Sequence, residues 1–188
     1  MRKRILSLLF VIISLTVVLA SCGKDSDIPE GMKRASDTKI VDYELFVPEA
    51  WIVDTPSFSS NDDKDIKKLA VSMAHVSTSD RSNISVAQWN TTANTSNVDL
   101  WWENEYKPEI TSILGATITL EDKELIIDGK SAKKYEYSAK IGETTYKYMV
   151  CATVSNGSIY VITYTSNEEN YEKNLEAVDE ILENIRFK

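Results

Sequence analysis

The chain has 188 residues, 43% of them hydrophobic, and a net charge of −8. Residues 1–21 hold three basic and no acidic side chains, so the rest carries 18 basic against 29 acidic residues, a net charge of −11. Nucleic-acid binding and electrostatic adhesion to anionic lipid both need clustered Lys and Arg, so this balance argues against either.

The first 21 residues have the pattern of a secretory signal. Arg2, Lys3 and Arg4 precede an apolar stretch at 5–20. A stretch of about 16 residues is shorter than the roughly 20 that a stable membrane span needs. We therefore expect a signal peptide at 1–21. An ordinary signal peptide with an incidental cysteine, or an uncleaved anchor, is the alternative.

The tetrapeptide Leu19-Ala20-Ser21-Cys22 closes this leader. It resembles the lipobox of bacterial lipoproteins. The resemblance implies that the Cys22 thiol is diacylglycerated and that the leader is cleaved before it. Two acyl chains suffice for stable attachment to a bilayer. The expected location is the cell membrane, lipid-anchored and facing the extracytoplasmic side, either the cell surface or the periplasm.

The stretch at 22–39, which starts at the lipobox cysteine, is rich in Gly, Asp, Ser and Lys and has no apolar period. It predicts a flexible tether, and about 15 such residues reach roughly 20 Å. The remainder, 40–188, has the length of one globular domain. Cys151 lies in an apolar strand pattern and has no partner once Cys22 is acylated. We interpret it as a buried residue rather than a reactive thiol.

The first half of the domain predicts short strands and then a helix. Strands are expected at 43–47, 51–53, 69–76 and 84–89. A helix is expected at 97–114, capped by Ser96 or Asn97. Because proline disrupts a helix interior, Pro108 predicts a break at 106–107 and the start of a second short helix, which would end at Gly115.

The second half predicts an antiparallel meander at 117–165, with turns at Asp128-Gly129, Gly142 and Asn156-Gly157. Both faces of the strand at 158–165 are apolar, so we expect it to be central. A final helix would begin with a capping box of Ser166 and Glu169. Its predicted buried stripe is Tyr171, Leu175, Val178, Leu182 and Ile185, and its wet face carries Glu172, Glu176, Glu180 and Glu183.

Four segments together carry a resemblance to a known family: Tyr43–Trp51, Asp80–Val86, Tyr160–Tyr164 with Tyr171, and Ile185–Phe187. They resemble the PsbP-like (Mog1p/PsbP) group, which includes many small bacterial lipoproteins. The resemblance implies an α+β fold with a central antiparallel β-sheet flanked by helices on both faces, an α/β/α sandwich. An NTF2-like or cystatin-like curved sheet is the alternative. Members of the group support a photosystem metal cluster or bind a small GTPase, and this sequence shows no residue set that matches either site.

Residues that could carry chemistry are few. His75 is the one histidine, and we interpret it as a packed or strand-edge residue. One His and one free Cys do not make a zinc site. The acidic run Asn61–Asp65 lacks the glycine and terminal glutamate of an EF-hand loop. We therefore predict no catalytic residue, no metal site and no cofactor, and do not expect an enzyme.

Trp101 and Trp102 are the pair that most favours a binding role. Adjacent helical residues point about 100° apart, so one indole would be half exposed. With Tyr106 they form the candidate interaction surface; the alternative is that both indoles pack between helix and sheet. The predicted function is a non-enzymatic interaction or accessory module of an envelope complex. A small-ligand or metal-ion binding protein of the envelope is the alternative.

Overall fold

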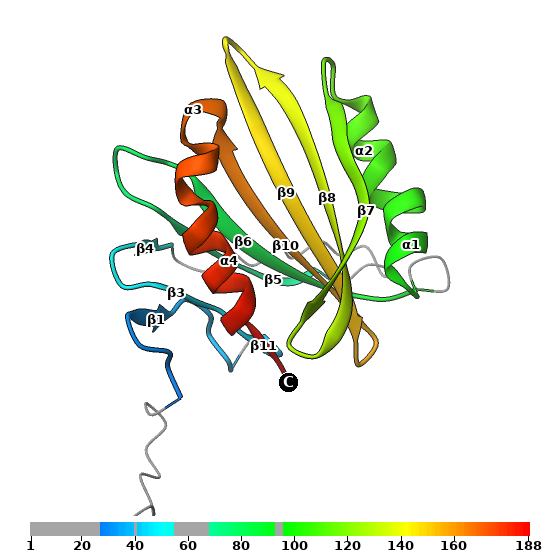
Figure 1. The fold of residues 1–188 in the computed structure, drawn as a ribbon. Coiled ribbons are helices and arrows are strands. Elements are labelled where there is room, and N and C mark those ends of the chain that lie inside the picture. The colour runs from blue at the N-terminus through cyan, green and yellow to red at the C-terminus, as the bar shows by residue number, and fades with distance from the viewer. Residues whose placement is uncertain (1–26, 40, 55–67, 93–95) are drawn as a thin grey trace, which may run out of the picture.

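The computed structural model describes residues 27–39, 41–54, 68–92 and 96–188. The predicted signal peptide, Cys22 and the acidic run Asn61–Asp65 lie outside these residues. The main feature is an antiparallel sheet of seven strands in the order β4-β5-β6-β10-β9-β8-β7 (Figure 1). The α+β class with an antiparallel sheet is therefore confirmed. The strands are β4 (Ile52–Val53), β5 (Lys68–His75), β6 (Asn83–Asn90), β7 (Thr117–Ile127), β8 (Lys130–Ile141), β9 (Thr144–Ser155) and β10 (Ser158–Asn167).

Strands β7 to β10 form the predicted meander. Asp128 and Gly129 have φ of 48° and 70°, and Asn156 and Gly157 have 51° and 74°. A positive φ at both central residues is what a type I′ hairpin turn requires, and its twist matches that of the strands it joins. The turn residues thus explain the consecutive antiparallel pairing. β10 is the fourth of the seven strands, which confirms its central position.

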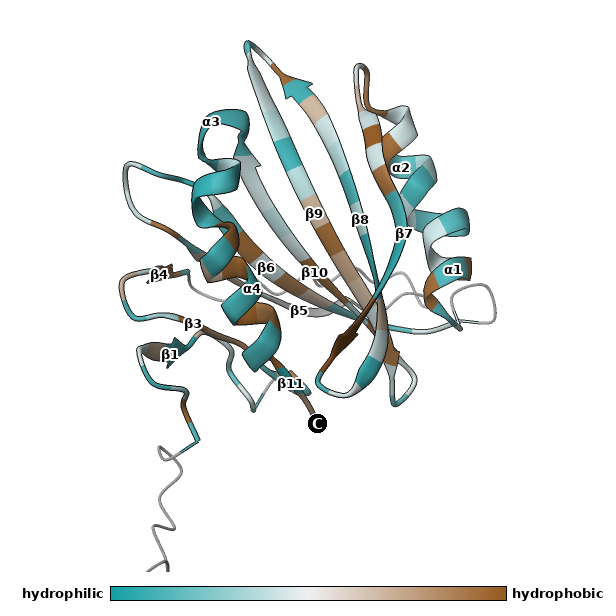
Figure 2. Cartoon of the chain, in the orientation of Figure 1, coloured by the Kyte–Doolittle hydropathy of each residue, from teal (hydrophilic) through white to brown (hydrophobic). Residues whose placement is uncertain are grey.

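β10 contributes to two separate hydrophobic clusters because neighbouring residues of a strand point to opposite faces. Ile159 and Val161 belong to one cluster, with Trp101, Trp102 and Ile110. Figure 2 shows hydrophobic residues along the middle of β6, β9 and β10. The other cluster contains Tyr160, Ile162 and Tyr164 of β10 together with Val178 and Ile181 of α4 (Leu175–Asn184).

The segment that carries Trp101 is one continuous helical run rather than two helices. It consists of α1 (Val98–Trp101), a π-helical turn η2 (Trp102–Tyr106) and α2 (Lys107–Ser112). The Asn97 side chain accepts the N–H of Leu100 at 2.9 Å, so the predicted cap is confirmed. The predicted break at 106–107 is wrong.

The π turn allows the helix to continue up to Pro108 without a break. The N–H of Lys107 donates to the carbonyl of Trp102, five residues earlier, so the helix widens just before Pro108. Pro108 then lies in the first turn of α2, where its missing N–H costs least. α2 ends at Ser112, and Gly115, with φ of 79°, lies in the turn before β7. The helix therefore ends two residues before the predicted last residue, Leu114.

The folded part begins earlier than the sequence indicated. β1 (Met32–Arg34) pairs with β3 (Phe46–Pro48), inside the stretch expected to be a tether. Met32 and Ala35 are both only 4% exposed and pack in the core. A strand of three residues has no detectable hydrophobic period, which is why this pairing was missed. A second two-stranded sheet pairs β2 (Tyr43–Glu44) with β11 (Arg186–Phe187), near the end of the chain.

The C-terminal helical run starts one residue later than predicted. It comprises α3 (Glu168–Tyr171), a 3₁₀ turn η3 (Glu172–Asn174) and α4. Asn167 is the cap, accepting the N–H of Asn170, whereas the Ser166 hydroxyl lies 2.7 Å from that of Ser82 in a buried contact. Ile181, absent from the predicted stripe, is fully buried, because it lies three residues after Val178 and four before Ile185 and therefore shares their face.

Candidate functional site

Both tryptophans of the helical run face the sheet. Trp101 is 5% and Trp102 3% exposed, so the expectation of a half-exposed indole is wrong. The π turn explains how two adjacent residues both point inward. An i to i+5 turn places Tyr106 beside Trp101, with 4.7 Å between ring centroids, and it also contacts Trp102 at 5.8 Å. The predicted interaction surface is therefore an aromatic cluster at the helix–sheet junction.

One side of this cluster lines a pocket of about 200 Å³ between the helical run and strands β6 and β10. Trp89 of β6 and Ile159 of β10 are opposite each other in the sheet and form the strand side. Trp102 does not line the pocket, because it stacks on Tyr135 deeper in the junction. The lining residues are Trp89, Asn90, Trp101, Glu105, Tyr106, Glu109 and Ile159.

Glu105 and Glu109 are the charged groups of this pocket. They are four residues apart on the helical run. Glu105 precedes Tyr106 in the chain and Glu109 follows it. Neither forms an ion pair with another described residue. Two other carboxylates of the run do have lysine partners: Asp99 pairs with Lys133 and Glu103 with Lys107. Among the residues that the structure describes, the negative charge at the pocket therefore has no ion-pair partner.

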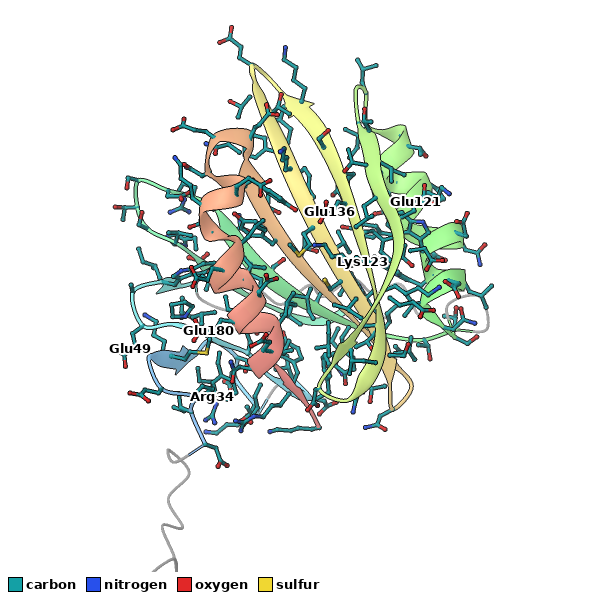
Figure 3. The ribbon with its side chains drawn as sticks, viewed as in Figure 1. Arg34, Glu49, Glu121, Lys123, Glu136 and Glu180 are labelled. Carbon is teal, nitrogen blue, oxygen red and sulfur yellow. The ribbon has the colours of Figure 1, made fainter. Side chains whose placement is uncertain are left out.

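Two lysines, Lys107 on the helical run and Lys133 on β8, form ion pairs with carboxylates. Lys107 lies 3.2 Å from Glu103 and 3.1 Å from Glu121 of β7, which is labelled in Figure 3. Lys133 bridges Asp99 and Asp122. Lys107 and Lys133 thus each have two carboxylate partners, and neither pairs with a carboxylate of the pocket.

Tyr106 presents a neutral phenol to the pocket. Burial raises its pKa, and hydrogen bonds with Tyr137 and Thr163 oppose this only in part. The negative charge of Glu109 raises it further. Burial also raises the pKa of Tyr137. The two phenols stay protonated at neutral pH and hold each other in place, so they offer an aromatic wall rather than an acid–base group.

The histidine is engaged elsewhere, on the β4–β5 side of the sheet. His75 is 5% exposed, which confirms the predicted packed residue. Its Nδ1 lies 3.1 Å from an Asp54 carboxylate oxygen, and its Nε2 lies 3.1 Å from the Arg81 guanidinium. Because guanidinium only donates, Nε2 accepts and Nδ1–H donates to Asp54. Both ring nitrogens are occupied, so neither is free to activate a nucleophile.

Two further sequence predictions concern cysteine and metal. Cys151 is 1% exposed, which confirms the predicted burial, and that burial raises the pKa of its thiol to about 12. Within the part of the chain that the structure describes, no three His, Cys, Asp or Glu side chains converge as metal ligands do. No helix in that part is long and apolar enough to cross a membrane.

Comparison with known proteins gives a structural match. Neither a protein-family model nor a curated protein sequence matches the chain. The structure of cyanobacterial PsbP (CyanoP) from Synechocystis sp. PCC 6803 superposes with a TM-score of 0.59 at 17% identity, covering 90% of this chain and 99% of that one. A Bacteroides thetaiotaomicron VPI-5482 structure gives 0.50 at 11%, covering 85% and 49%. LpqN of Mycobacterium tuberculosis, involved in cell envelope biogenesis, gives 0.49 at 12%, covering 78% and 83%.

The cyanobacterial match spans nearly the whole of both chains and shows the fold. It agrees with the resemblance carried by the sequence segments from Tyr43 to Phe187. The chain therefore has a PsbP-like fold.

Proposed function

We propose that this protein is a lipid-anchored, non-enzymatic binding module of the bacterial cell envelope, serving as an accessory to an envelope complex. The leader at 1–21 and the lipobox ending in Cys22 support export and anchoring. The single observation that carries the binding role is the aromatic pocket, whose Glu105 and Glu109 pair with no described residue. A concave apolar site with a few convergent polar groups is the usual form of a binding site.

The proposed anchor would hold the domain close to the bilayer. Since β1 begins at Met32, nine residues lie between it and Cys22. Nine residues span at most about 30 Å even when fully extended. The domain would therefore work next to the membrane surface and reach partners that are themselves in or on the membrane.

The absence of catalysis is part of the proposal. A general base must lie within hydrogen-bond reach of the proton that it takes. His75 has both ring nitrogens engaged by Asp54 and Arg81. Cys151 is buried, and its pKa is raised far above neutral. The groups best suited to nucleophilic chemistry are thus used in packing.

The test is photo-cross-linking in living cells from a probe at the pocket. Asn90 lines the pocket and is exposed, so it tolerates a photoreactive residue. Glu180, exposed on α4 and labelled in Figure 3, serves as the matched control position. The proposal predicts a cross-linked species from position 90 that is absent from position 180. The same products from both positions would refute a binding role for the pocket.

A second candidate, a small-ligand binding protein of the envelope, is favoured by the size of the pocket. At about 200 Å³ it is smaller than the roughly 300–1,000 Å³ of sites that hold drug-sized molecules. It would therefore suit a compact metabolite. A ligand of this kind should raise the melting temperature, because binding only the native state stabilises it by mass action.

A further inference from the structure

We infer that the pocket lined by Trp89, Trp101, Tyr106, Glu105 and Glu109 binds a small organic cation, an ammonium group on a compact apolar body. This inference rests on the proposed binding function and names the chemistry of the ligand.

The aromatic wall supplies the first reason. Three of the residues lining the pocket are aromatic, two tryptophans and one tyrosine. The face of an aromatic ring carries partial negative charge and attracts ammonium groups, most strongly for Trp. Ile159, 1% exposed, adds an apolar floor on β10 that suits the carbon atoms of the ligand.

The charge balance supplies the second reason. Glu105 and Glu109 line the same pocket and form no ion pair with any described residue. Lys107 and Lys133, the two lysines that pair with carboxylates of the run, are held by Glu103, Glu121 and the Asp99–Asp122 pair. Among the described residues that line the pocket none is basic. An anion would be repelled there, whereas a cation would gain two carboxylates that pair with no residue that the structure describes.

The size of the pocket restricts the body of the ligand. A volume of about 200 Å³ is below that of sites for drug-sized molecules, so a choline-sized or arylethylamine-sized cation suits it. Trp101 and Tyr106 are packed against each other at 4.7 Å, which gives the ligand a preformed wall. Preformed walls reduce the ordering cost of binding.

The test is titration calorimetry on the purified full-length protein in detergent. The probes are choline, tetramethylammonium and phenethylamine, together with 3,3-dimethylbutanol, the uncharged isostere of choline. We expect at least one cation to bind, and to bind about tenfold or more tighter than the neutral isostere, with affinity falling as salt is added. Absence of binding by all three cations, or equal binding of choline and its isostere, would overturn the inference.

Charge-matched variants locate the site. The double variant Glu105→Gln/Glu109→Gln should weaken cation binding by about fivefold or more and leave the isostere unaffected. The control Glu176→Gln/Glu180→Gln removes the same charge from two exposed residues, also four apart, on α4. Equal weakening by both double variants would show that net charge, not the pocket, attracts the cation, and would refute the site.

This test separates the inference from the proposed function. A specific cross-link from Asn90 together with no cation binding would refute the organic cation and leave the binding module standing. Cation binding lost in the pocket variant, with no cross-link that distinguishes positions 90 and 180, would support the inference and refute a macromolecular partner at the pocket.

Discussion

Trp102 of the π turn stacks face to face on Tyr135 of β8, with ring centroids 3.8 Å apart and planes 10° apart. This contact fastens the helical run to the sheet, because both rings are almost fully buried at 3% and 1% exposure. Stacked aromatic pairs contribute about 0.5–1.5 kcal/mol beyond the area they bury. The stack keeps the neighbouring Trp101 in place as a wall of the pocket.

Removal of this ring should destabilise the fold strongly. Trp102→Ala leaves a cavity opposite Tyr135, so we expect a loss of about 3–5 kcal/mol in the free energy of unfolding. Urea denaturation followed by circular dichroism measures it. Leu114→Ala is the control, because Leu114 is 94% exposed and its loss should cost within ~0.5 kcal/mol. A similar small effect for both variants would contradict the packing described here.

Replacing Gly157 in the hairpin between β9 and β10 should lower stability through the backbone conformation rather than through a steric clash. Gly157 has φ of +74°, and a Cβ added there would meet nothing within 4 Å. Gly157→Ala should therefore cost about 1–2 kcal/mol of stability through the left-handed conformation alone. Gly157→Asn should cost less, since Asn tolerates that region better. Equal unfolding midpoints for Ala and Asn would argue against this cause.

Asp80 should make stability depend on pH. Burial works against its charged form, but hydrogen bonds from Ser82 and Asn174 outweigh this and hold the pKa of Asp80 below its usual 3.8. The lowered pKa means that the carboxylate stabilises the fold above the unfolded-state pKa and loses that effect as pH falls through the folded-state pKa. The difference in stability between the wild type and Asp80→Asn should thus be larger at about pH 6 than at about pH 3.

Urea unfolding of both proteins at the two pH values measures that difference. Because all other titrating groups are shared, their contributions cancel in the comparison. A difference that grows on acidification would contradict the hydrogen-bonded carboxylate.

Cys151 should be inert in the folded protein. Its side chain is 1% exposed, and burial raises its pKa to about 12, so little thiolate exists near neutral pH. A Cys22→Ser variant isolates this thiol, since the chain has two cysteines. We expect a disulfide reagent to label it rapidly in urea and only at the rate of unfolding in buffer. Fast labelling of the folded variant would contradict the burial.

Cys22 should determine attachment to the membrane. Two acyl chains give stable anchoring, whereas the excess of acidic residues gives no electrostatic attraction to anionic lipid. We expect the wild type in the membrane fraction and Cys22→Ser in the aqueous fraction after cell fractionation. Equal membrane partitioning of the two proteins would refute the lipid anchor.

The predictions from sequence succeeded where the signal is local. Asp128-Gly129 and Asn156-Gly157 favour one turn type through their own backbone preferences, so the meander followed from them. The two-sided apolar pattern of 158–165 likewise placed β10 at the centre. Such signals are contained within a few consecutive residues, and tertiary contacts did not overrule them.

The errors arose where distant residues decide the outcome. The burial of both Trp101 and Trp102 depends on the π turn and on Tyr135, which comes from another strand. Whether Lys133 and Lys107 pair with Glu105 and Glu109 or with other carboxylates likewise depends on distant residues, Asp122 and Glu121 among them. The pair of carboxylates on either side of the Tyr106–Lys107–Pro108 segment was visible in the sequence. The pairing of Lys133 with Asp99 rather than with these carboxylates was not visible, because that contact spans 34 residues.

The measurement that tests the central claim most directly is mass spectrometry of the species cross-linked in living cells to a photoreactive residue at position 90. The same experiment measures the mass of the Cys22 peptide. We expect a diacylated Cys22 peptide and a recurrent product at position 90 that the probe at Glu180 does not yield. An unmodified Cys22 peptide, or identical products from both positions, would contradict the account of a lipid-anchored module that binds through its aromatic pocket.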